Sequence, residues 1–209
     1  MSHRHPLFAR YYARVSRLME PSVGPYRQKL VDGASGRVIE VGAGNGLNFP
    51  HYPATVTEVI AVEPEPHLRS IAEASAARTT IPIKVVDATA DDLPADEAQC
   101  DVAVASLVLC SVPDQDRALA EIRRVLKPGG ELRFFEHVRA AAPGRRRVQQ
   151  ALDATIWPWL AGGCHCGRDT RAAIEHAGFT IDRIDELTSA DTQMTFPTAP
   201  QILGTATRR

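Results

Sequence analysis

The chain lacks the features that mark extracellular, nucleic-acid-binding and membrane-spanning proteins. Four cysteines among 209 residues are too few for a disulfide scaffold, so a reducing, cytoplasmic setting is expected. A net charge of −1 leaves no excess of basic residues, and nucleic acid is therefore not an expected partner. With 44% hydrophobic residues, the chain is predicted to bury a core of substantial size and to form one globular unit.

Long hydrophobic runs are also missing. The longest, Val102 to Val112, is interrupted by Ser106 and Ser111 and is about half of the ~20 residues that a transmembrane helix needs. No apolar stretch follows the basic segment Met1 to His5, so neither a signal peptide nor an integral membrane segment is predicted. The expected partner is a small molecule, and the sequence does not indicate an oligomeric state.

Strand-like and helix-like segments alternate along most of the chain. Strands are predicted at 56–62, 81–86, 101–106 and 131–138, and helices at 66–77 and from Asp114 to Leu126. Strands that are apolar nearly throughout, such as Val102 to Val108, are typical of a parallel sheet covered by helices on both faces. Phe179 to Leu187 and Gln201 to Thr207 are expected to close the sheet as an antiparallel hairpin. The predicted class is α/β, Rossmann-like and doubly wound.

Helices are also expected outside this central part. Helical spacing at Leu7 to Met19 and at Tyr26 to Val31 predicts two helices before the first strand. Residues 1–36 are therefore predicted to form a helical lid on a globular unit of residues 37–209. Arg145 to Leu160 is expected to be a helix interrupted at Pro158.

The segment from Val38 to Gly46, VIEVGAGNG, carries the most specific functional signal. An apolar run leads into Glu40, and three glycines then alternate at Gly42, Gly44 and Gly46. Glycine is required where the backbone adopts a positive φ or lies against a ligand, so the turn is predicted to hold a cofactor.

Two details of this turn select among cofactors. The dinucleotide pattern G-x-G-x-x-G would place its third glycine where this chain has Leu47. A carboxylate at Glu40 would repel a pyrophosphate, whereas it suits the ammonium and sulfonium groups of S-adenosylmethionine. S-adenosylmethionine, with S-adenosylhomocysteine as its product, is therefore the predicted cofactor.

The ends of the following strands complete the predicted site. Glu63 ends the second strand, where a carboxylate can accept hydrogen bonds from the ribose hydroxyls, and Asp87 ends the third, where it can accept one from the adenine amino group. The cofactor-binding set is completed by Ala43, Asn48, Pro64 and Ala88 in these turns and by Ser106 and Leu107, which close the fourth strand.

Two residues at the end of the fifth strand are the candidates for catalysis. Glu136 and His137 could act as a base or orient the acceptor, and because neighbouring strand residues face opposite sides, only one is expected to face the pocket. The tract Gly162 to Gly167 contains Cys164, His165 and Cys166, but its spacing is not that of a structural zinc site. No metal is predicted.

These motifs resemble the class I S-adenosylmethionine-dependent methyltransferases over residues 38–138. Further segments resemble the methyltransferase-like thiol S-methyltransferase family: Leu107 to Val112, Arg124 to Leu126, Glu136 to Val138, Gln149-Gln150, Gly163-Cys164 and Arg168 to Thr170. The resemblance implies a seven-stranded, mostly parallel sheet. Known animal members carry an N-terminal hydrophobic membrane-associating segment that is not expected here, so membrane attachment is not carried over.

The expected activity is transfer of a methyl group to a small, hydrophobic acceptor. A thiol is favoured because its pKa, near ~8.5, leaves some thiolate at neutral pH. A lipid, a quinone or a phenol is the alternative acceptor. An NAD(P)-dependent oxidoreductase and a cofactor-binding domain without catalysis are the alternatives from other classes.

Overall fold

The computed structural model describes residues 6–209, with side chains from Phe8 onward. Seven strands form one sheet in the order β3-β2-β1-β4-β5-β7-β6. The strands are β1 (Gly36–Val41), β2 (Val56–Val62), β3 (Ile83–Val86), β4 (Cys100–Ser106), β5 (Leu126–His137), β6 (Phe179–Leu187) and β7 (Gln201–Arg208). Strands β1 to β5 are parallel to one another, and β7 is antiparallel to both β5 and β6. The predicted mostly parallel sheet with a C-terminal antiparallel hairpin is confirmed.

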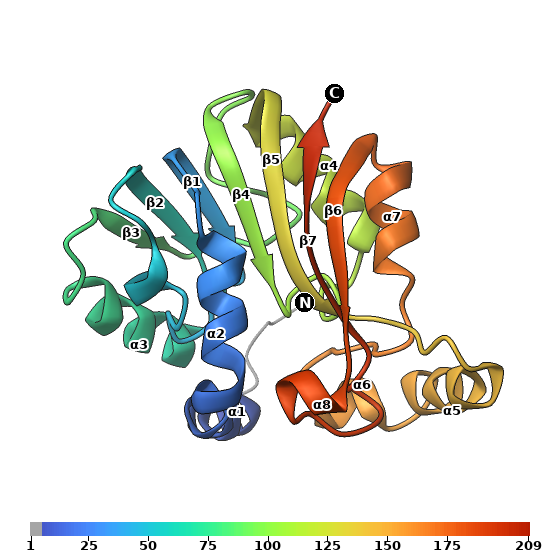
Figure 1. Cartoon of the computed structure of the whole chain (residues 1–209). Coiled ribbons are helices and arrows are strands. Elements are labelled where there is room, and N and C mark those ends of the chain that lie inside the picture. Colours follow the sequence, from blue (N-terminus) through green and yellow to red (C-terminus); the bar gives the residue numbers. More distant parts are fainter. Residues whose placement is uncertain (1–5) are drawn as a thin grey trace.

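Helices cover both faces of this sheet (Figure 1). They are α1 (Pro6–Leu18), α2 (Glu20–Val31), the 3-10 helix η1 (Phe49–His51), α3 (Pro66–Ala76), α4 (Gln115–Val125), α5 (Pro143–Asp153), α6 (Trp157–Leu160), α7 (Thr170–His176) and α8 (Ser189–Thr192). Their buried residues divide between two hydrophobic clusters: α4 and α7 contribute to one, and α2 and α3 to the other. The doubly wound arrangement follows from this division.

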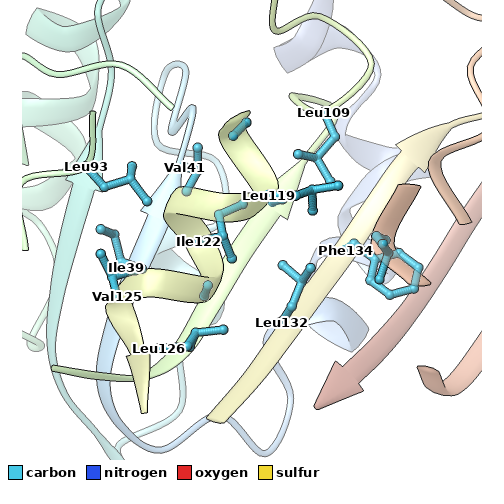
Figure 2. Packing of buried hydrophobic residues seen from close by; sticks show 14 of the residues in the cluster. Ile39, Val41, Leu93, Leu109, Leu119, Ile122, Val125, Leu126, Leu132 and Phe134 are labelled. Atoms are coloured by element: carbon cyan, nitrogen blue, oxygen red, sulfur yellow. The ribbon is translucent and has the colours of Figure 1, made fainter. Parts of the chain in front are cut away.

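Alternation along β1 shows how one strand serves both clusters. Ile39 and Val41 belong to the cluster that includes α4, whereas Val38 belongs to the cluster that includes α2. Figure 2 shows Ile39 and Val41 packed with Ile122 and other apolar side chains of α4. A strand buried on both sides reads as a continuous apolar run, which is why its position was clear in the sequence.

Element boundaries differ most from the sequence expectations at three places. Helix α2 begins at Glu20, earlier than the expected Tyr26, because Pro21 lies in its first turn, where proline is tolerated, and Pro25 is accommodated within it. Strand β5 already begins at Leu126, before the predicted glycine turn. The long C-terminal helix breaks between α5 and α6, ahead of Pro158, which lies in the first turn of α6.

The strand register brings the residues of the predicted site together at the carboxyl ends of the parallel strands. Val41 of β1 lies beside Val62 of β2 and Ala105 of β4, so the residues that follow these three strands emerge together. In Figure 1, α1, α6 and α8 gather near the end of the sheet at which β4 finishes. Among residues 6–209, no helix combines the length and the apolar character needed to cross a membrane.

Candidate functional site

A cavity of about 650 Å³ opens at the carboxyl ends of the parallel strands. Its volume lies within the range of small-molecule and cofactor sites. Of the predicted site residues, those on the cavity wall are Gly42, Gly44, Glu63, Pro64, Ser106, Leu107 and His137. The other predicted residues do not line it: Glu40, Ala43, Gly46, Asn48, Asp87, Ala88 and Glu136.

The glycine turn forms one wall of the cavity. Gly42 has a φ of 67° and Gly44 a φ of 57°, in the left-handed region that favours glycine. A Cβ on Gly42 would lie 2.4 Å from the side chain of Val108, so a larger residue has no room there. The Gly44 amide donates a hydrogen bond of 2.8 Å to the carboxylate of Glu63. The turn and the end of β2 are thus joined into one cradle.

Glu40 lies behind this wall, at the start of a chain of buried polar groups. Its carboxylate accepts hydrogen bonds from the Asn48 amide at 2.9 Å and from the Tyr52 hydroxyl at 2.6 Å. The Asn48 oxygen in turn accepts from the guanidinium of Arg27, which also donates to the Ser106 hydroxyl at 3.3 Å. Glu40 therefore positions polar groups of the cavity wall and does not itself reach the cavity surface.

Burial has a strong electrostatic effect on the two acids. Desolvation raises the pKa of Glu40 to about 7, against the opposing effect of its hydrogen bonds to Tyr52 and Asn48. Burial also raises the pKa of Glu63, while the amides of Glu65 and Gly44 act to lower it. Glu63 is the acid of this pair that lines the cavity, so a ligand that donates hydrogen bonds or carries positive charge would be favoured beside it.

The loop after β3 differs from the prediction. Asp87 leaves 67% of its side chain exposed and forms an ion pair with Arg69 at 2.9 Å, and Ala88 packs against the hydrophobic core. Thr89, Ala90 and Asp91 of the same loop line the cavity instead. The end of β3 was predicted correctly. The residues that reach the cavity, however, begin at Thr89, two positions after the predicted Asp87.

At the end of β4, backbone strain marks the cavity wall. Leu107 adopts a φ of 58°, which is uncommon for a residue with a side chain, and its amide donates to the Phe135 carbonyl at 2.7 Å. Such conformations persist where the surrounding structure imposes them, and they concentrate at functional sites.

Glu136 and His137 face different surroundings, as the alternation of a strand requires. Glu136 is fully buried, and its carboxylate accepts hydrogen bonds from the amides of Val108, Leu109 and Cys110 at 2.9 to 3.1 Å. It holds the loop after β4 and does not meet the cavity, so it has no position from which to act as a base. His137 lines the cavity, with Nδ1 3.5 Å from the Cys110 sulfur.

Arg27 is a charged residue of the wall that the sequence interpretation missed. The residue is 6% exposed and lines the cavity, and its guanidinium forms an ion pair with Glu20 at 3.3 Å. The sequence signal was the spacing alone, because Arg27 follows Val23 by four residues and both lie on the buried side of α2. A cation among the buried positions of a helix indicates an anionic partner.

Comparisons with known proteins agree with this geometry. Residues 39–134 match the family model described as "Methyltransferase domain". The chain is 33% identical over 185 residues to thiol S-methyltransferase TMT1B of Homo sapiens, covering 86% of this chain and 75% of that protein. It is 37% identical over 155 residues to human thiol S-methyltransferase TMT1A, covering 71% of this chain and 62% of that protein.

The chain belongs to the S-adenosylmethionine-dependent methyltransferase family. A solved Thermotoga maritima structure, described as an S-adenosylmethionine-dependent methyltransferase and possible histamine N-methyltransferase, has the same fold. It superposes with a TM-score of 0.72 at 20% identity and covers 97% of this chain and 98% of that chain. The protein is therefore an enzyme that uses S-adenosylmethionine, and the oxidoreductase alternative is not favoured.

The cavity of this methyltransferase fits that cofactor. Gly42 and Gly44 leave space for a ligand to lie against the backbone, Glu63 offers a buried carboxylate, and Arg27 offers a buried cation. Among the described residues, Nε2 of His137 and Nε1 of Trp157 are buried without a hydrogen-bond partner, and both residues line the cavity. Polar groups of a bound molecule would satisfy such atoms.

Proposed function

We propose that this methyltransferase transfers the methyl group to the sulfur of a small, hydrophobic thiol. The observation that carries the proposal is the mixed character of the cavity, which has a polar end at Glu63 and Arg27 and an apolar remainder. Apolar wall residues come from α1, α6 and the loop after β4, and they include Phe8, Val15, Val112, Trp157 and Leu160. The thiol S-methyltransferases to which the chain is similar support sulfur as the acceptor atom.

Several polar residues of the cavity have roles in this proposal. Glu63 would accept hydrogen bonds from the ribose hydroxyls, Arg27 would pair with the methionine carboxylate, and Thr89 to Asp91 would border the adenine in place of Asp87. The cofactor supplies a methyl group already activated by its sulfonium. The protein has to orient the acceptor and exclude water, because a thiol is a competent nucleophile once partly ionised. Of the predicted catalytic pair, Glu136 and His137, it is the His137 side chain that lines the cavity, at the end proposed for the acceptor.

The helical segment before β1 is proposed to cover the bound molecules. Tyr12 of α1 lies against the glycine turn, since a Cβ on Gly44 would be 3.5 Å from its ring, and the Phe8 ring lies against Gly162 at the other side. The Asn45 side chain donates to Ser16 at 3.0 Å, which attaches α1 to the turn. Slower hydrogen exchange in α1 after addition of S-adenosylmethionine would support this lid, and unchanged exchange would contradict it. Residues 1–5 of the predicted lid lie outside the described residues.

A cytoplasmic location without a nucleic-acid partner is also proposed. All four cysteines are free and buried, as expected for a reducing compartment. Cell fractionation checks the location, and recovery of the protein with membranes or secreted material would contradict it.

A panel of acceptors tests the thiol assignment. With alkyl thiols, we expect mass spectrometry to detect the methyl thioether together with S-adenosylhomocysteine, because a thiol is the acceptor that ionises most readily near neutral pH. Alcohols with the same alkyl chains serve as matched controls and should remain unmethylated. Turnover confined to phenols, quinones or lipids would refute the thiol assignment and favour the alternative acceptors.

Replacing Glu63 tests the cofactor end. Glu63→Ala should weaken S-adenosylmethionine binding by about 1 to 3 kcal/mol, or about 5- to 150-fold, because it removes a buried acceptor of hydrogen bonds. Calorimetry measures this change, with circular dichroism to verify folding. Asp87→Ala is the matched control: its exposed side chain should change the affinity by less than about twofold. Equal weakening in the two variants would restore the predicted adenine contact of Asp87.

A further inference from the structure

Three side chains from separate parts of the chain meet at the acceptor end of the cavity. Cys110 lies in the loop after β4, His137 ends β5, and Cys164 lies in the loop between α6 and α7. His137 Nδ1 is 3.5 Å from the Cys110 sulfur and 3.6 Å from the Cys164 sulfur. All three residues line the cavity, and their ligand atoms lie within 4.8 Å of one another.

These separations match those of a tetrahedral metal centre. With zinc–sulfur bonds near 2.3 Å and zinc–nitrogen bonds near 2.0 to 2.1 Å, tetrahedral angles place the sulfur and nitrogen roughly 3.6 Å apart. Both sulfur–nitrogen distances in the structure agree with that value. Two sulfurs and one imidazole are also the donor types that zinc-like cations prefer. A three-ligand site on a cavity wall leaves the fourth position open to a bound molecule, as in catalytic zinc sites.

Hydrogen bonds hold the two loops that carry Cys110 and Cys164 next to each other. Glu136 binds the Cys110 amide at 3.1 Å, and the Cys110 carbonyl accepts from the His165 amide at 2.7 Å, which joins the two loops. Gly163, with a φ of 92°, allows this approach, because a Cβ there would lie 2.9 Å from the Ser111 carbonyl oxygen. The two loops that carry Cys110 and Cys164 are therefore positioned by contacts that do not require a cation.

We propose that Cys110, His137 and Cys164 bind one zinc-like divalent cation whose fourth coordination position faces the acceptor. Binding replaces two thiol protons with the metal, so that two protons are released and the charges of one dication and two thiolates cancel. If the proposed thiol methylation is correct, the acceptor sulfur occupies the fourth position as a thiolate, and its proton leaves to solvent. That role rests on the proposed function, whereas the metal site itself does not.

This site lay outside the metal pattern considered in the sequence. The tract Gly162 to Gly167 places Cys166 near Cys164, but the Cys166 sulfur donates to Asp153 at 3.3 Å and is not part of the cluster. The ligands at positions 110, 137 and 164 are separated by more than twenty residues in each interval, so local spacing could not reveal them.

Cobalt absorption spectroscopy tests the site without reference to activity. The full chain, reduced with a phosphine and freed of metal, is titrated with Co²⁺ alone. We expect one equivalent to produce thiolate-to-cobalt charge-transfer bands and the intense visible bands of tetrahedral Co²⁺, and Zn²⁺ to displace them. Cys110→Ser and Cys164→Ser should each weaken binding by more than the ~10- to 100-fold that loss of an outer-shell partner costs. Cys166→Ser is the matched control, because a hydroxyl can still donate to Asp153, and it should retain the spectrum.

Each alternative result has a definite meaning. A spectrum that shows nothing but weak octahedral absorption would overturn the proposal. A tetrahedral spectrum that survives in both Cys110→Ser and Cys164→Ser would also overturn it, because the metal would then be bound by other histidines and cysteines. Thermal unfolding verifies that the variants are folded. His137→Asn tests the third ligand: this variant should keep the thiolate-to-cobalt charge-transfer bands but bind Co²⁺ with lower affinity. Failure of methyl transfer in the acceptor panel with an intact cobalt spectrum would refute the thiol function and leave the metal site standing.

Discussion

Glu136→Ala is expected to lower the free energy of unfolding by about 3 to 5 kcal/mol. The fully buried carboxylate accepts hydrogen bonds from three consecutive backbone amides, those of Val108, Leu109 and Cys110. Alanine would leave these amides without an acceptor, and each buried unpaired donor costs about 1 to 3 kcal/mol. Urea unfolding monitored by circular dichroism measures the loss.

Two further variants sharpen this test. Glu136→Gln keeps one acceptor oxygen, so its loss should be about half that of alanine. Glu186→Ala, at an exposed position of β6, should change stability by no more than about 0.5 kcal/mol. A Glu136→Ala protein as stable as the Glu186→Ala control, but inactive, would contradict the structural role and return Glu136 to the list of candidate bases.

The stability of the ligand-free protein is expected to fall between about pH 4 and pH 8 because of Glu40. Burial raises the pKa of Glu40 from an ordinary value of 4.5 to about 7. A group with a raised folded-state pKa stabilises the protein fully below its unfolded pKa, and this contribution is lost as pH rises through the folded pKa. The shift corresponds to roughly 3 kcal/mol at 1.36 kcal/mol per unit.

Comparison with Glu40→Gln isolates this contribution from that of other acids. The amide can accept from Asn48 and donate to the Tyr52 hydroxyl, so it preserves the buried contacts without titrating. Nearby Arg27 favours the ionised form of Glu40 and Glu63 disfavours it, and both remain in the variant. Urea unfolding across the pH range should show the steeper decline in the parent protein. Parallel stability profiles for the two proteins would show that Glu40 does not titrate in this range.

Local patterns were sufficient for the sheet and for the cofactor-binding turn. Apolar runs such as Val59 to Val62 can be buried on both faces only within a covered parallel sheet, so their positions and class follow from composition. Gly42 and Gly44 have positive φ values because the turn after β1 demands them, and that demand is visible as alternating glycines. The choice of Glu63 as a wall residue followed from its place at the end of β2.

Long-range contacts decided the remainder of the site. The sequence could show that Glu136 and His137 alternate, but only the register of β5 beside the loop after β4 assigned Glu136 to backbone amides and His137 to the cavity. Asp87 faces solvent because Arg69 is placed to pair with it.

The sequence by itself determined the fold class and the cofactor, because both depend on short-range patterns that a strand and its following turn must satisfy. Tertiary structure alone decided that Arg27 joins the cavity wall and that Cys110, His137 and Cys164 meet. Those positions come from different elements, and their proximity depends on how the helices and loops pack at the carboxyl edge of the sheet. No spacing along the chain encodes that packing.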